Sequence, residues 1–200
     1  MATQSDQAQI YCQLVPLAGM TLLLPRRALG QSLVLDAVRL ETGGPPWLLG
    51  YADVPVTTTA NSGWGRRRWW RRAAATGPPP APAKYPVIAL EALAGGSVPV
   101  RNRRSRVIPL RSPCSALEYG GFAVVSQGFA RFTAVNAAAL RALPPAPSDA
   151  GIALSRVGIG SMTVLIPDLG AIEQRIADAL ATVADGGLAC EPWQPKAPGC

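Results

Sequence analysis

The sequence predicts an all-β fold, a small sandwich or barrel that carries one C-terminal helix. Short apolar segments recur along the chain and are separated by Gly, Pro, Ser or Asn, which is typical of strands in a sandwich or barrel. Helical spacing of apolar residues is convincing only after residue 168. The 200 residues, 48% of them hydrophobic, suffice for one domain, or two small packed ones, with a real core.

The first strands are predicted close to the N-terminus. Residues 10–17 and 20–24 are β-type apolar runs on either side of a short Ala-Gly turn, and this pattern predicts a hairpin. Pro25 ends the second strand. Residues 31–38 fit a strand or a helical turn, because their apolar residues satisfy both spacings, and the two interpretations stay open.

Residues 45–51 and 85–91 predict two more strands, each with turn residues at its edges. Five further strands are predicted at 106–110, 122–125, 129–135, 152–157 and 162–166. Gly120, Gly121 and Gly128 lie around the second of these five. Glycine beside a strand favours a bulge or a sharp corner, so we expect a tightly curved sheet.

The one predicted helix starts after Asp168, which can cap it, and Gly186-Gly187 stops it. Its apolar stripe consists of Leu169, Ile172, Ile176, Leu180 and Val183. We expect this stripe to pack on the barrel. Residues 143–149, rich in proline, predict a loop, and the Pro- and Gly-rich end of the chain predicts a loose tail.

Residues 53–84 interrupt this pattern with a low-complexity insert that has neither helical nor strand periodicity. The insert contains Arg66, Arg67, Arg68, Arg71, Arg72 and Lys84. These six cations and Asp53 give the insert a charge of +5, and since the chain carries +7, only +2 remains elsewhere (7 − 5 = 2). A basic domain that tracks phosphate over its whole face is therefore not supported.

The composition also excludes most enzyme and metal chemistry. The chain has no histidine, which removes the Ser-His and Cys-His nucleophile systems and every histidine-containing metal site. Its four cysteines are scattered without a Cys-x-x-Cys pair, and the start of the chain lacks a signal sequence. No apolar stretch approaches the roughly 20 residues that cross a bilayer. We therefore expect a cytoplasmic protein without catalytic activity, cofactor, small-molecule substrate or transmembrane segment.

The order of the predicted elements resembles that of the CheW family of chemosensory coupling proteins, and most closely the CheW-like proteins of pilus-type chemosensory systems. The matching segments are the hairpin of residues 11–24, Pro46-Trp47-Leu48-Leu49-Gly50, Pro86-Val87-Ile88-Ala89-Leu90-Glu91 and Ile166-Pro167-Asp168-Leu169. The likeness covers a domain at residues 9–182, interrupted by the insert, with tails at 1–8 and 186–200.

The resemblance implies two small five-stranded SH3-like barrels packed side by side. It also implies a noncatalytic adaptor that holds a chemoreceptor signalling tip and a CheA-type histidine kinase together, in chemotaxis or in pilus-driven (twitching) motility. In that family an Arg-Gly stretch between the Gly step and the Pro-Val strand helps to contact the receptor. Here the insert occupies that place from Asp53 onward, so we expect an altered or lost receptor face.

The residues expected to bind a partner are Trp47, Leu48, Leu49, Gly50, Pro86, Val87, Arg103 and Arg104. Trp47 has a competing interpretation, since an apolar residue in a short strand usually fills the core. Arg103 and Arg104 belong to a cluster of arginines at residues 101–106. That cluster either docks an acidic kinase surface or a phosphate, or is a solvated turn.

An alternative function is a small β-barrel that binds nucleic acid or an anionic membrane through the insert. The residues that would do so are Trp64, Arg66, Arg67, Arg68, Trp69, Trp70, Arg71 and Arg72. Arginines would pair with phosphates, while tryptophans would stack on bases or lie at the lipid interface. The competing interpretations are an insertion without a selected role and a shifted reading frame, because such Arg, Trp, Pro and Ala density resembles out-of-frame GC-rich coding.

Overall fold

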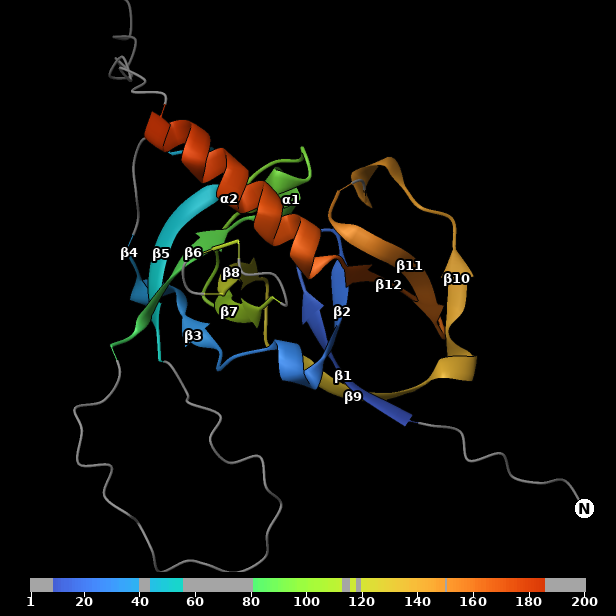
Figure 1. The fold of residues 1–200 in the computed structure, drawn as a ribbon. Helices are drawn as coiled ribbons and strands as arrows, with labels where there is room; N and C mark the ends of the chain where they lie inside the picture. Colours follow the sequence, from blue (N-terminus) through green and yellow to red (C-terminus); the bar gives the residue numbers. More distant parts are fainter. Residues whose placement is uncertain are drawn as a thin grey trace, which may run out of the picture.

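The computed structural model describes residues 9–39, 44–55, 81–112, 116–117, 120–149 and 151–185. These residues form two six-stranded β-sheets that lie side by side, with a long C-terminal helix running over them (Figure 1). The predicted all-β class with a C-terminal helix is confirmed. Each sheet has six strands, where five were expected, because very short edge strands complete both of them.

Sheet A joins the two ends of the described chain. Its strand order is β10-β11-β12-β2-β1-β9. The strands are β1 (Gln9–Pro16), β2 (Thr21–Pro25), β9 (Arg131–Asn136), β10 (Arg141–Leu143), β11 (Ala153–Ile159) and β12 (Met162–Pro167). The predicted hairpin β1–β2 is confirmed, with Pro16 opposite Thr21. It lies between β9 and β12, where Leu22 is paired with Leu165.

Sheet B is built from the middle of the chain, in the order β3-β7-β8-β6-β5-β4. The strands are β3 (Leu33–Val34), β4 (Val38–Arg39), β5 (Leu48–Val54), β6 (Ala83–Ile88), β7 (Arg106–Arg111) and β8 (Gly121–Ser126). All its pairs are antiparallel except β6–β8. Residues 31–38, left open between strand and helical turn, contain both, because β3 and β4 flank a 3₁₀ turn at Leu35–Ala37.

Four further short helical elements connect the strands. They are η1 (Arg26–Ala28), α1 (Leu90–Leu93), η3 (Ala137–Ala139) and η4 (Pro147–Asp149). The loop predicted at 143–149 is corrected at both ends, since Leu143 belongs to β10 and the last three residues form η4. Among the described helices, none is long and apolar enough to span a membrane.

The predicted ends of the insert are strand residues. Asp53 is paired with Lys84 and Val54 with Ala83, so the β5–β6 ladder continues into the segment predicted to be foreign. Arg39 on the neighbouring strand β4 also donates a 2.9 Å hydrogen bond to Asp53. The domain therefore includes both edges of the insert, and residues 56–80 between them lie outside the described part of the chain.

Three apolar clusters show how the two sheets share one body. One cluster lies within sheet A around Val164, and another within sheet B around Val107. The largest lies between the sheets and includes Leu22 of β2, Phe122 of β8 and Ile176 of the C-terminal helix. Successive residues along the strands of sheet B belong alternately to the cluster within sheet B and to the cluster between the sheets. These strands are therefore buried on both faces.

The C-terminal helix α2 (Leu169–Asp185) closes the largest cluster from above. Asp168 caps its start as predicted, because one carboxylate oxygen accepts a 2.9 Å hydrogen bond from the Ala171 amide. Ile172 and Ile176 are fully buried, whereas Val183 near the end is exposed. The predicted stripe thus packs on the core from Leu169 to Leu180, and Val183 lies beyond this contact.

Gly121, at the predicted corner beside β8, is required by its surroundings. A Cβ atom at this position would lie 2.5 Å from the carbonyl oxygen of Leu110 and 2.8 Å from the Tyr85 ring. Because β7 and β6 approach so closely there, no side chain fits without moving backbone. This contact explains Gly121, the first residue of β8, whereas Gly120 before it has a left-handed backbone, with φ of 66°, that favours glycine.

Candidate interaction surface

The arginine loop, residues 101–106, leads into β7 and has a fixed backbone shape. The Ser105 side chain is buried, and its oxygen accepts a 3.0 Å hydrogen bond from the Asn102 amide. The Asn102 side-chain oxygen accepts a 2.7 Å bond from the Arg104 amide. These bonds fix the loop through backbone amides. The side chains of Arg103 and Arg104 are exposed to solvent.

Arg106 at the end of this loop is held between backbone and an aromatic ring. Its Nη1 donates to the carbonyl oxygens of Arg103 and Ser105, at 3.1 and 2.8 Å. Its guanidinium lies 4.6 Å from the centroid of the Phe129 ring. Such a stacked pair contributes about 0.5–1 kcal/mol at an exposed site. Arg106 therefore has a structural role in the loop, in addition to its charge.

Hydrogen bonds connect the arginine loop of sheet B to sheet A. The Asn102 side chain donates to Gln127 Oε1 at 2.9 Å, and the Gln127 amide donates to the carbonyl oxygen of Pro16 at 2.8 Å. Next to Gln127, the buried hydroxyl of Ser126 donates to the Gly128 carbonyl at 2.7 Å. The exposed arginines thus stand at the junction of the two sheets on a preorganised support.

Two hollows open beside the arginine loop. The larger groove, about 670 Å³, is lined by Leu14, Pro16, Phe129, Met162, Arg104 and Arg131 among others. The smaller groove, about 560 Å³, is lined by Val34, Leu35, Asp36, Arg101, Arg103 and Arg106 among others. The larger groove is bordered by two arginines and no carboxylate. A protein face that presents carboxylates between apolar side chains complements it.

Six of the eight residues expected to bind a partner lie inside the protein. Trp47 and Leu48 are buried in the cluster between the sheets, and Leu49 and Val87 are buried within sheet B. Gly50 and Pro86 are buried in the paired strands β5 and β6. The structure supports the interpretation that Trp47 fills the core. Its side chain is 9% exposed, so a partner could contact it only if the surrounding structure unfolded. Among these eight, Arg103 and Arg104 are the surface residues.

All the residues proposed for the alternative function, from Trp64 to Arg72, lie outside the described part of the chain. Their contacts and placement have no structural account. The prediction that they bind nucleic acid or an anionic membrane therefore stays a prediction from sequence.

Sequence reasoning missed the side chains that make the arginine loop into a surface. Phe129 is 64% exposed, and Asn102 and Gln127 supply the bonds that orient the loop. A large exposed aromatic next to arginines is a sign of an interface. The sequence signal was present in the Gln127-Gly128-Phe129 turn, but its nearness to residue 106 depends on the pairing of β7 with β8.

Cys12 and Glu91 are buried titratable groups with raised pKa values. Burial raises the pKa of the Cys12 thiol, which keeps it protonated and unreactive at neutral pH. No cluster of three or more His, Cys, Asp or Glu side chains capable of holding a metal occurs in the described ranges. The buried carboxylate of Glu91 accepts a 2.6 Å hydrogen bond from the Ala18 amide and so ties α1 to the turn of the β1–β2 hairpin.

Glu91→Gln is expected to make stability less dependent on pH. Burial raises the pKa of Glu91 despite its hydrogen bonds, so the folded state binds this proton more tightly than the unfolded state. The contribution of Glu91 to the free energy of unfolding is therefore full below its ordinary pKa near 4.5. This contribution is lost as pH rises through the higher pKa of the folded state. Glutamine keeps the acceptor for Ala18 without the charge. Urea unfolding from pH 4 to 7 should show the variant gaining stability relative to the wild type; parallel curves would contradict this.

Comparison with known proteins finds a similar fold among solved structures. No protein-family model matches the chain, and no curated protein matches it in sequence. Among solved structures, the scaffolding protein TtCheW from Thermoanaerobacter tengcongensis is similar with a TM-score of 0.55 and 11% identity. The match covers 80% of this chain and 89% of that one. The chain has a CheW-like fold. At this identity the likeness concerns the fold alone. The two adjoining sheets described above are part of that fold.

Proposed function

We propose that the protein is a noncatalytic cytoplasmic adaptor that couples a chemoreceptor to a CheA-type histidine kinase. Its setting would be chemotaxis or pilus-driven (twitching) motility. The observation that carries the proposal is the CheW-like fold, which spans 80% of the chain and is shared with a scaffolding protein. The arginine loop on its preorganised support adds a surface suited to protein contacts. Coupling needs two such surfaces and no catalytic group.

The proposed kinase-binding surface is the arginine loop with its two grooves. Arg103 and Arg104 are exposed there, and Arg104 lines the larger groove together with Phe129. Aromatic residues and arginine are enriched at protein interfaces. The insert enters and leaves the fold at the ends of β5 and β6. The receptor face implied by the family resemblance lies at that step, so we propose that receptor coupling is altered or lost while kinase binding is kept.

Binding of the purified chain to the regulatory domain of a cognate CheA-type kinase tests the proposal directly. Isothermal titration calorimetry should give a Kd of about tens of micromolar or tighter, an affinity ordinary for a transient interface. A second titration, with the cytoplasmic fragment of a receptor, tests whether receptor binding is altered or lost. Absence of kinase binding at roughly 100 µM would contradict the adaptor.

Reversing two charges of the arginine loop, with Arg103→Glu and Arg104→Glu together, is expected to weaken kinase binding by roughly tenfold or more. The side chains are exposed and the loop is held by backbone groups, so the fold should be retained. Arg141→Glu with Arg175→Glu is the matched control, because it makes the same charge change at exposed positions on β10 and α2. Equal weakening by both pairs would mean that net charge alone drives the association.

Deleting residues 56–80 is expected to leave the domain folded with unchanged kinase binding. Val54 and Ala83 are already opposite each other, so Pro55, Ala81 and Pro82 can serve as the connecting turn of the β5–β6 hairpin. The deletion removes five arginines and lowers the net charge from +7 to +2 (7 − 5 = 2). Thermal unfolding and the kinase titration check it. If single-stranded oligonucleotides or anionic vesicles bind the full chain in a salt-sensitive way and the deletion abolishes this, the alternative function gains its support.

A further inference from the structure

Strand β9 is an open sheet edge of a kind that proteins usually protect. The described sheets have four edge strands, and three are short, with two residues each in β3 and β4 and three in β10. Pro144 and Pro145 follow β10 directly. β9 has six residues, continuous pairing with β1, and neither proline nor a bulge. Short length, proline and bulges are the usual protections, and β9 has none of them.

The outward face next to this edge is aromatic. Tyr11 of β1 and Phe132 of β9 are 68% and 70% exposed. Tyr11 is opposite Ala134, and Phe132 is opposite Gln13, so both aromatic rings stand on one face of sheet A. The other face of β9 is fixed in the core through the buried Val135. The buried Val135 therefore fixes the register of β9 against β1, while the outward-facing side chains stay accessible.

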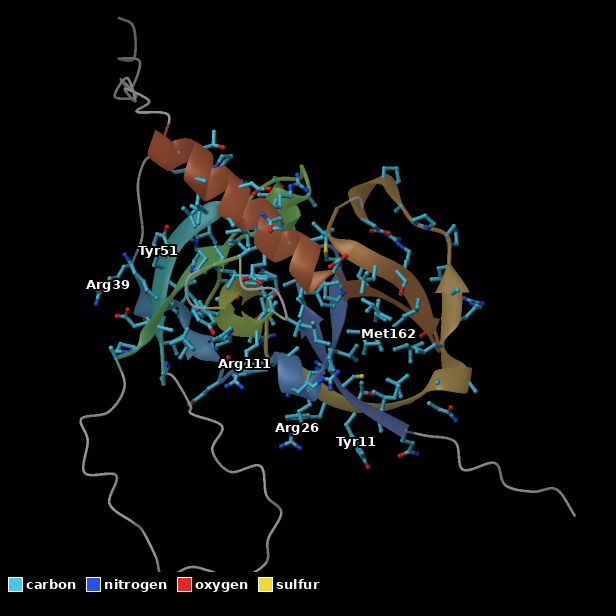
Figure 2. The ribbon with its side chains drawn as sticks, in the orientation of Figure 1. Tyr11, Arg26, Arg39, Tyr51, Arg111 and Met162 are labelled. Carbon is cyan, nitrogen blue, oxygen red and sulfur yellow. The ribbon has the colours of Figure 1, made fainter. Side chains whose placement is uncertain are left out.

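The charge around β9 is positive. The Arg26 guanidinium lies 5.6 Å from the centroid of the Phe132 ring, and Figure 2 shows Arg26 and Tyr11 pointing away from the body of the protein beside β1. Arg131 begins the strand with an exposed side chain. The six strands of sheet A contain three arginines and no Asp or Glu. A second copy of this chain would therefore bring like charges together at β9.

We propose that β9 binds an extended, acidic segment of a partner protein, which adds to sheet A as a seventh strand. Half of the backbone N–H and C=O groups of an edge strand point away from its neighbour and supply the affinity of strand addition. Alternate side chains of the added segment would lie on opposite faces of the sheet. Its carboxylates would lie on the face of Arg131, and the apolar residues between them would pack on Phe132 on the other face. This site adjoins the arginine loop through Arg131, which also lines the larger groove, but its existence does not depend on kinase coupling.

The probe for this site is a labelled octapeptide of alternating Val and Glu, titrated into the full chain and followed by fluorescence anisotropy. It should bind, and amide hydrogen exchange in residues 131–136 should slow on binding. The same peptide with Lys in place of Glu should bind at least about tenfold more weakly. A version N-methylated on alternate amides, which keeps the charge and loses the donors, should weaken by a similar factor.

Two variants locate the site on the protein. Phe132→Ser and Arg131→Glu should each weaken binding of the acidic peptide severalfold and lower the melting temperature by no more than about 4 °C. Leu154→Ser on β11 is the control, since Leu154 is 67% exposed on the same sheet. No binding, or equal binding of the N-methylated peptide, would overturn strand addition. A dimer in sedimentation that Arg131→Glu alters would show that a second copy occupies the edge, which also overturns the proposal.

Discussion

Phe122→Ala is expected to lower the free energy of unfolding by about 3–5 kcal/mol, the range for removing a buried aromatic ring. Phe122 is fully buried in the cluster that joins β2, β8 and α2. The cavity would open between the two sheets, where neither sheet can collapse without moving the other. Urea denaturation measures the loss, which should be accompanied by a fall in the melting temperature of about 10 °C.

Phe132→Ala is the matched control for this prediction, because it makes the same chemical change ten residues away on an exposed ring. Phe132 is 70% exposed, and the Arg26 guanidinium lies over its ring in a cation–π pair. Its replacement should cost about 1 kcal/mol or less. Similar losses from the two substitutions would contradict the shared core between the sheets.

Asp149→Ala is expected to lower the free energy of unfolding by about 2–3 kcal/mol, through lost hydrogen bonds to a buried charge. The carboxylate is 5% exposed. It accepts bonds from Arg156 Nε and Nη2 at 2.8 and 2.7 Å, and from the Ala146 amide at 2.8 Å. The larger losses known for fully buried ion pairs are not expected, since the Arg156 side chain is 26% exposed and can be solvated.

Asp149→Asn separates charge from shape in this pair. The amide oxygen still accepts a hydrogen bond, but the second bond to the Arg156 guanidinium is lost. Chemical unfolding should give an intermediate loss. If asparagine and alanine are equally harmful, the charge itself holds the segment between β10 and β11; if neither is harmful, the pair is not structural.

Local signals predicted the elements that depend on few neighbours. The β1–β2 hairpin follows from a two-residue turn between apolar runs, and α2 follows from its cap at Asp168 and its stripe. β10 was missed because three residues before two prolines carry too little pattern. The sheet that each strand joins could not be predicted from sequence, since it depends on pairings between distant segments such as β1 with β9.

The candidate surface was predicted only where charge marks it. Arg103 and Arg104 form a polar run at a turn, which sequence alone can locate. Trp47 and Val87 have the composition of interface residues and of core residues alike, and only tertiary packing decides between them. The open edge of β9 has no sequence signal of its own, because an edge is defined by the strand that is missing beside it.

The arrangement of sheet A sets an order for the assembly of the protein. Sheet B is continuous in sequence from Leu33 to Ser126, so its strands can pair as soon as that segment has left the ribosome. The β1–β2 hairpin is made first, yet its partners β9 and β12 are synthesised last. Contacts between distant segments slow folding. The N-terminal hairpin therefore waits with both of its edges open, and this is the stage at which a nascent chain would be most exposed to aggregation or to a chaperone.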